Sequence, residues 1–84
     1  MIYVYVLVSE VDGLMYTGCT RDLRKRLELH NAGKVASTAK RIPLKLIYYE
    51  ACTDKNDAFK REKYLKTTYG KRYIRTRCSN YFTG

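Results

Sequence analysis

The segment YTGCTRDLRKRLELH, Tyr16–His30, is predicted to contain the end of a strand, a tight turn and a helix. At about 100° per residue, the leucines of this helix mark an apolar arc. Arg26 and His30 project from inside that arc, and because they are four residues apart their side chains are neighbours. A charged side chain and the only histidine therefore share the side expected to be buried, where they can line a pocket with Tyr16.

The composition favours one globular domain that binds an anionic partner. The chain has 84 residues, which suits a single domain over residues 1–84, and 17 Lys and Arg against 8 Asp and Glu give a net charge of +9. Nucleic acid is the commonest partner of so basic a chain. No apolar run approaches the roughly 20 residues of a membrane span, and no signal-peptide pattern is seen, so we expect a cytoplasmic protein without membrane contact. The three cysteines are widely spaced and are expected to be free thiols.

Two antiparallel strands are predicted at the start of the chain. Met1–Ser9 is apolar and β-branched on both parities, as in a strand covered on both faces. Asp12-Gly13 suits a two-residue hairpin turn, after which Leu14–Thr17 returns as the second strand. With that turn Ser9 faces Tyr16, so Tyr16 lies on the same face of the sheet as Tyr5. A slip of one residue would send Tyr16 to the other face.

A basic loop follows the central helix. Thr20 or Asp22 can cap that helix, and Gly33 occupies the position where a left-handed residue ends it. Residues 34–43 then combine cations with hydroxyls and show no apolar periodicity. We expect phosphate contacts there, although a merely solvated connection has the same composition. The candidate contacts in the loop are Lys34, Thr38, Lys40 and Arg41.

The rest of the chain is predicted to form one more strand and two helices. Leu44–Ala51 is strongly β-forming. A second helix is expected from Lys55 to Thr67, ended by Tyr69-Gly70, and a short third helix from Lys71 to about Cys78. The tail, residues 79–84, is expected to fray unless its aromatic residues dock on the core. The fold class is α+β, a three-stranded antiparallel sheet flanked by helices in the order β-β-α-β-α-α.

Glu62 is the other misplaced charge. It lies in the inward stripe of the second helix, formed by Ala58, Phe59 and Leu65. A carboxylate on an apolar face needs a partner, either a basic side chain such as Arg26 or a divalent cation. The alternative is a partly exposed Glu62 paired with Lys66 four residues on.

These residues, taken in order, resemble the GIY-YIG nuclease domain. The likeness rests on Tyr3-Val4-Tyr5, then Tyr16-Thr17-Gly18, then Arg26 and His30 on one helix, and Glu62 on a later helix. It spans the chain from Tyr3 to about Gly70. The closest likeness is to small stand-alone members of the family, which carry strings similar to Thr20–Leu23, His30–Lys34 and Lys60–Lys66. The first motif departs from the family's name, because Tyr3 stands where that name has glycine.

The resemblance implies an enzyme that cuts DNA phosphodiester bonds with a single divalent ion, Mg²⁺ or Mn²⁺. The residues that match the family's catalytic positions are Tyr5, Tyr16, Arg26, His30 and Glu62, and Glu62 is the metal ligand. Gly18 matches the terminal glycine of the second motif and joins the nucleic-acid contacts. In chemical terms, Arg26 can hold the phosphate and a tyrosinate can accept a proton from water.

The tyrosine base requires a lowered pKa, since a phenol ordinarily titrates near pH 10. Arg26, His30 and the metal ion are the positive charges that can lower it. We favour Tyr5 as the base, with Tyr16 orienting water or phosphate. The alternative is that both are ordinary packing tyrosines of a sheet and His30 is a core histidine with its hydrogen bonds satisfied.

Three functions are compatible with the sequence. The first is a metal-dependent DNA endonuclease of repair or recombination, which acts on branched or damaged DNA and can rely on a protein partner for targeting. The second is a nucleic-acid-binding module that keeps the site without turnover. The third is a basic interaction subunit. The five matched residues favour the endonuclease.

Overall fold

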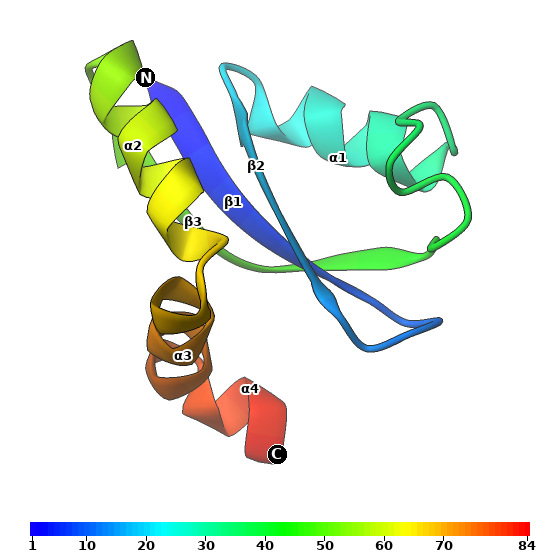
Figure 1. Ribbon diagram of the computed structural model, residues 1–84. Coiled ribbons are helices and arrows are strands. Elements are labelled where there is room, and N and C mark those ends of the chain that lie inside the picture. Colours follow the sequence, from blue (N-terminus) through cyan, green and yellow to red (C-terminus); the bar gives the residue numbers. More distant parts are fainter.

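A computed structural model describes residues 1–84 and has the predicted α+β order with one additional short helix (Figure 1). The elements are β1 (Ile2–Ser9), β2 (Met15–Thr20), α1 (Leu23–Asn31), β3 (Leu44–Cys52), α2 (Lys55–Leu65), α3 (Thr68–Arg77) and α4 (Ser79–Thr83). The three strands form one antiparallel sheet in the order β2-β1-β3. None of the helices is long and apolar enough to cross a membrane.

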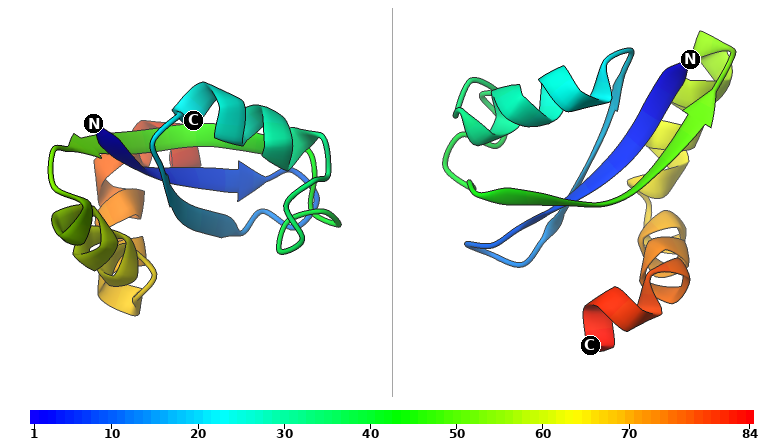
Figure 2. Two further views of the ribbon diagram at one scale, coloured as in Figure 1. Left: turned by 90° about the horizontal axis from the view of Figure 1, so that it is seen from above. Right: turned by 180° about the vertical axis from the view of Figure 1, so that it is seen from behind.

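The central strand β1 is covered on both faces, as its sequence predicts. Figure 2 shows α1 on one face of the sheet and α2 on the other. Side chains of a strand alternate between faces. Three even-numbered residues of β1 join the larger apolar cluster, which consists of Ile2, Val4, Val6, Ala58, Leu65 and Ile74. The odd-numbered side lies under α1 and forms a smaller cluster of Tyr5, Leu7 and Leu44.

The hairpin between β1 and β2 is longer than predicted. Tyr16 pairs with Leu7 rather than with Ser9, and the backbone N–H of Ser9 donates to the carbonyl of Leu14 at 3.1 Å. The longer loop is stabilised by side-chain caps, because the Ser9 hydroxyl accepts from Val11 N–H and the Asp12 carboxylate accepts from Leu14 N–H. The register differs from the predicted one by two residues, so Tyr16 stays on the face of Tyr5.

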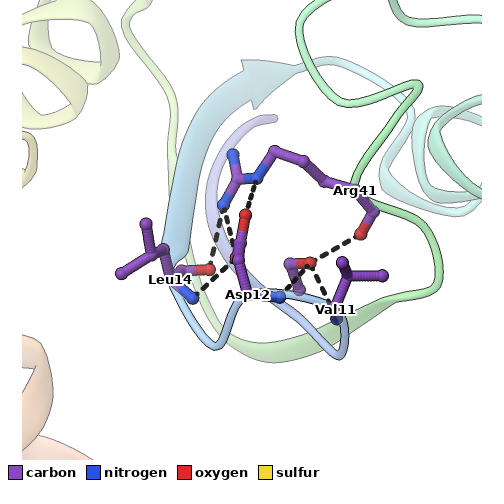
Figure 3. Close-up of polar contacts among 5 residues, drawn as sticks. Val11, Asp12, Leu14 and Arg41 are labelled. Atoms are coloured by element: carbon purple, nitrogen blue, oxygen red, sulfur yellow. Dashed lines mark hydrogen bonds and ion pairs between the residues drawn. The ribbon is translucent and has the colours of Figure 1, made fainter.

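The basic loop is tied to this hairpin. Figure 3 shows the Arg41 guanidinium reaching both Asp12 and the carbonyl of Leu14. The ion pair joins Arg41 Nε to Asp12 Oδ2 at 2.8 Å, and the buried Ser9 hydroxyl donates to the carbonyl of Arg41 at 2.6 Å. The far end of the loop over residues 34–43 is therefore fixed.

The predicted ends of α1 and the predicted start of α2 at Lys55 are correct, whereas the end of α2 and the start of α3 are wrong. Asp22 caps α1 and Gly33 follows it with φ 74°, as predicted. The helix α2 ends at Leu65, and α3 already begins at Thr68, because the Thr67 hydroxyl accepts from the N–H of Gly70 and caps the new helix. Gly70 is not a terminator. It lies buried in the first turn of α3, where a Cβ would collide with the backbone of Leu65.

The tail is also more ordered than predicted. Residues Ser79–Thr83 form α4, and Phe82 packs against the larger apolar cluster. Docking of an aromatic side chain on the core removes the tendency of the terminus to fray. All three cysteines are free thiols, as expected.

Candidate active site

Three aromatic rings from different elements meet under α1. Tyr5 comes from β1, Tyr16 from β2 and His30 from the last turn of α1. The ring centroids of Tyr16 and His30 are 5.0 Å apart, those of Tyr5 and His30 are 5.7 Å apart, and those of the two tyrosines are 6.5 Å apart. The structure thus brings together the two tyrosines and the histidine that the sequence singles out.

A buried chain of hydrogen bonds links Tyr5, His30 and Thr38. The Tyr5 hydroxyl lies 2.8 Å from His30 Nε2, and His30 Nδ1 lies 2.8 Å from the Thr38 hydroxyl. The Thr38 hydroxyl itself donates to the carbonyl of Val35, so its oxygen accepts from His30 Nδ1–H. His30 Nε2 then has a free lone pair, and the Tyr5 hydroxyl donates its proton to it.

Burial keeps both ends of this bond uncharged. Desolvation, reinforced by the charge of Arg26, lowers the pKa of His30, so the imidazole is neutral at pH 7. Desolvation also raises the pKa of Tyr5, and this effect outweighs the hydrogen bonding and charge of Arg26, which act to lower it. The expectation that neighbouring cations bring the phenol down is therefore wrong for the protein alone. A neutral His30 is a proton acceptor here rather than a source of charge.

Gly18 makes room for the Tyr5 phenol. It pairs with Tyr5 across β1 and β2, and a Cβ at this position would collide with the phenol ring and its hydroxyl. Gly18 is itself buried. The absence of a side chain thus allows the Tyr5 ring to lie over β2, which is a different role from the predicted contact with nucleic acid.

Glu62 comes from α2, on the other side of the sheet. Its charge acts to raise the pKa of both Tyr5 and Cys19, so the carboxylate lies within electrostatic range of both groups. The side chain is 22% exposed, and Glu62 Oε2 lies 3.1 Å from Lys66 Nζ. The charged partner of Glu62 is therefore Lys66, the alternative that the sequence allows, and not Arg26. Phe59, predicted to be buried beside Glu62, is exposed instead.

Comparison with known proteins assigns this chain to a family. The family model described as the GIY-YIG catalytic domain matches residues 1–76. A UPF0213 protein of Lacticaseibacillus paracasei is 46% identical over 65 residues, which are 76% of this chain and 72% of the relative. A UPF0213 protein of Streptococcus pyogenes is 49% identical over 65 residues, 76% of this chain and 70% of the relative.

The chain belongs to the GIY-YIG family. That membership supports a nuclease-like function, and the nucleases of the family generally depend on a divalent metal. No solved structure matches the chain significantly.

The donor set of this GIY-YIG site fits a weakly coordinated hard cation. No group of three or more His, Cys, Asp or Glu side chains is placed to hold a metal. Glu62 is a single carboxylate with part of its surface open to solvent. One carboxylate plus several waters is a normal arrangement for Mg²⁺, which dehydrates reluctantly. A single carboxylate with access to solvent is therefore a donor set that suits a hard divalent cation which keeps most of its waters.

The basic loop of the GIY-YIG chain divides into two kinds of residue. Lys34 and Lys40 are exposed. Thr38 is fully buried on His30, so its hydroxyl is not available to a phosphate, and Arg41 is engaged with Asp12. The role of Thr38 beneath His30 is the functional feature that the sequence missed. The only hint is a hydroxyl in a short loop that must fold back from the end of the histidine helix.

Proposed function

We propose that this protein is a divalent-metal-dependent endonuclease that hydrolyses phosphodiester bonds in DNA. The observation that carries the proposal is the buried Tyr5–His30 hydrogen bond, with the carboxylate of Glu62 within electrostatic range of the phenol. A buried tyrosine bonded to a neutral histidine is an arrangement for moving a proton. The net charge of +9 favours a polyanionic substrate.

Tyr5 and His30 provide a path for the proton of the attacking water. As water attacks phosphorus, its proton passes to the Tyr5 oxygen while the proton of Tyr5 passes to His30 Nε2. His30 becomes an imidazolium, and when the product leaves the proton returns from Nε2 to the Tyr5 oxygen, whose own proton passes to water. Thr38 holds the imidazole in the required orientation through Nδ1. In this scheme a free tyrosinate never has to exist, so the raised pKa of Tyr5 is compatible with its role as base.

Arg26 and Glu62 have complementary duties. The Arg26 guanidinium lies close enough to influence both Tyr5 and His30, and it can hold the scissile phosphate by charge-assisted hydrogen bonds. Glu62 would hold the divalent ion. That ion, when bound, supplies positive charge for the phosphoryl and leaving oxygens. Tyr16, whose hydroxyl accepts from Ser37 at 3.4 Å, would orient water or phosphate.

DNA is held chiefly through phosphates in this proposal. Lys34 and Lys40 are the exposed cations of the loop beside the site. The affinity should fall with salt with a log-log slope of roughly −0.9 per phosphate contact on duplex DNA. Lys34→Ala together with Lys40→Ala should reduce that slope, whereas a flat salt dependence in the parent protein would remove DNA as the ligand.

The Glu62–Lys66 ion pair favours a second candidate function. If Glu62 serves only to pair with Lys66, the protein binds nucleic acid without cutting it. An exposed pair four residues apart on a helix stabilises by only about 0.3–0.5 kcal/mol. The two candidates therefore predict very different effects of removing the carboxylate.

The deciding experiment incubates supercoiled, duplex, branched and single-stranded DNA with the protein in magnesium, in manganese and in chelator. Glu62→Gln keeps the shape but removes the charge that a hard cation requires, and it should lower the cleavage rate at least about 10²-fold with DNA affinity unchanged. Lys66→Met is the matched control, since it breaks the same ion pair and leaves the carboxylate free. Equal cleavage by Glu62→Gln and the parent protein would exclude the metal role of Glu62, and absence of cleavage in every metal would support the binding module.

A further inference from the structure

The largest cavity of the protein is separate from the Tyr5 cluster. It has a volume of about 550 Å³ and opens between α1 and the β1–β3 side of the sheet. Cavities that bind small organic groups have volumes of roughly 300–1,000 Å³. The cavity therefore has the size of a ligand site, and none of the residues assigned to catalysis lines it.

The lining of this cavity combines three kinds of surface. The floor is apolar and consists of Leu23, Leu27 and Leu46. Two tyrosines form a wall, Tyr3 from β1 and Tyr49 from β3, with their rings edge to face and their centroids 6.0 Å apart. The rim carries Arg21 and Arg24, both exposed, and the capping residue Asp22 is the one acidic side chain among the lining residues.

The cavity adjoins the catalytic cluster, because Leu23, Leu27 and Leu46 line the cavity and also pack against the apolar cluster that contains Tyr5. Arg24 and Arg26 are two residues apart and therefore about 200° apart around the helix. Arg24 lines the cavity, whereas Arg26 acts on Tyr5 and His30. Tyr3 and Tyr5 also lie on one face of β1, about 6.6 Å apart along the strand. The two sites are thus neighbours, and each takes one residue from β1 and one from α1, at positions two residues apart in both elements.

The chemistry of the cavity matches a nucleotide. An exposed aromatic ring over an apolar floor binds a planar ring by stacking, and every nucleobase presents such a face. An arginine beside the aromatic ring can bind the phosphate attached to that base. Tyr49 is 53% exposed, so its ring is accessible from solvent.

We propose that this cavity binds an unpaired nucleobase of the DNA strand, next to the phosphodiester held at Tyr5. The inference rests on the proposed nuclease function and deepens it, because it assigns a preference for substrates that present an unstacked base beside the cleavage site. Tyr49 and Tyr3 contact the base, and Arg24 contacts its phosphate. Bases in an intact duplex are stacked and paired, and a base that is already unpaired enters such a site at lower cost.

The test measures binding in chelator, where no metal-dependent cleavage takes place. A single-stranded oligonucleotide carrying 2-aminopurine and an oligonucleotide of the same length with abasic sites have equal phosphate charge. Their affinities are measured for the parent protein and for Tyr49→Ala and Arg24→Ala. Tyr69→Ala and Arg75→Ala are the matched controls, since both residues are exposed on α3 and their removal makes the same chemical and charge changes.

Tyr49→Ala should weaken binding of the base-containing strand about tenfold, while Tyr69→Ala leaves it nearly unchanged. On the abasic strand Tyr49→Ala should have little effect, because the partner of the ring is already absent. Arg24→Ala should weaken the binding of both strands more than Arg75→Ala does. The emission of 2-aminopurine should change when the strand binds the parent protein and should not change when it binds Tyr49→Ala.

Equal losses on the base-containing and abasic strands, or equal losses for Tyr49→Ala and Tyr69→Ala, would overturn the inference. Melting temperatures confirm that each variant is folded. The result is independent of turnover: a protein that never cuts DNA can still show the base dependence, and an active nuclease can lack it. Failure of this proposal and failure of the proposed function are therefore distinguishable.

Discussion

The two faces of β1 have different tasks. On the even-numbered face, Val4 and Val6 are completely buried in a cluster of six apolar residues shared with α2 and α3. On the odd-numbered face, the smaller cluster includes Tyr5, and the nearby buried groups include His30 and Thr38. All buried side-chain polar atoms have hydrogen-bond partners. A period of two residues thus lets one strand contribute an apolar cluster to one face and a hydrogen-bonded tyrosine to the other.

The largest effect is expected on the even-numbered face. Leu65→Ala removes a side chain that is 1% exposed and should lower the free energy of unfolding by about 2–5 kcal/mol. The cleavage rate per folded molecule should stay nearly the same, because the hydrogen bonds of Tyr5, His30 and Thr38 lie on the opposite face of β1. Urea unfolding and single-turnover cleavage are measured on the same preparation. If this variant is unfolded, Ile74→Val should give the same pattern with a loss of about 0.5–1.5 kcal/mol.

The next largest effect is expected at Gly18 of β2, which lies opposite Tyr5 of β1. Gly18→Ala places a methyl group against the Tyr5 phenol and should reduce the cleavage rate about 10²-fold by displacing the base, at a cost of about 1–3 kcal/mol in stability. If Gly18 acts only through Tyr5, then Gly18→Ala should add little to the loss of rate already caused by Tyr5→Phe. Independent, additive losses would show a second role for Gly18.

The smallest effect is a dependence of stability on pH from the odd-numbered face. The pKa of His30 is lowered by folding, so on acidification the unfolded chain takes up this proton first. The contribution of neutral His30 to folding stability is fully present above the pKa of histidine in the unfolded chain, near 6.5. It is lost as the pH falls toward the lower pKa of His30 in the folded protein. Melting temperatures should therefore decrease below about pH 6.5, with a shallower decrease for His30→Gln. If the melting temperatures of the parent protein and His30→Gln decrease in parallel with pH, a group other than His30 causes the pH dependence.

The sequence predicts the alternation of faces better than the details of loops. The apolar residues of β1 occur on both parities, so burial of both faces follows from pattern alone, and the two-residue error in the hairpin register leaves Tyr16 beside His30. The boundary between α2 and α3 is missed because Gly70 is read as a terminator, whereas it is a close-packing residue after the Thr67 cap. Local patterns do not show which backbone a glycine approaches.

Side-chain partners across the fold are the other limit. Thr38 cannot be assigned to His30 from the sequence, because the path of the loop over residues 34–43 depends on its attachment to the hairpin through Arg41 and Asp12. The sequence also does not show that desolvation outweighs the effect of Arg26 at Tyr5, and this balance reverses the direction expected for the pKa of the phenol. The sequence therefore predicts that Tyr5, Tyr16 and His30 lie together, but it does not predict the direction in which the pKa of the Tyr5 phenol shifts.

The role of Tyr5 as the base is tested most directly by the cleavage rate of Tyr5→Phe under single-turnover conditions in magnesium. DNA affinity and melting temperature are measured on the same protein. Phe keeps the ring over Gly18 but removes the hydroxyl that donates to His30 Nε2. If Tyr5 is the base, the rate falls about 10²- to 10⁴-fold while DNA affinity stays unchanged and the protein remains folded. A Tyr5→Phe protein that cuts DNA as fast as the parent would contradict that role, because the odd-numbered face of β1 would then supply no base.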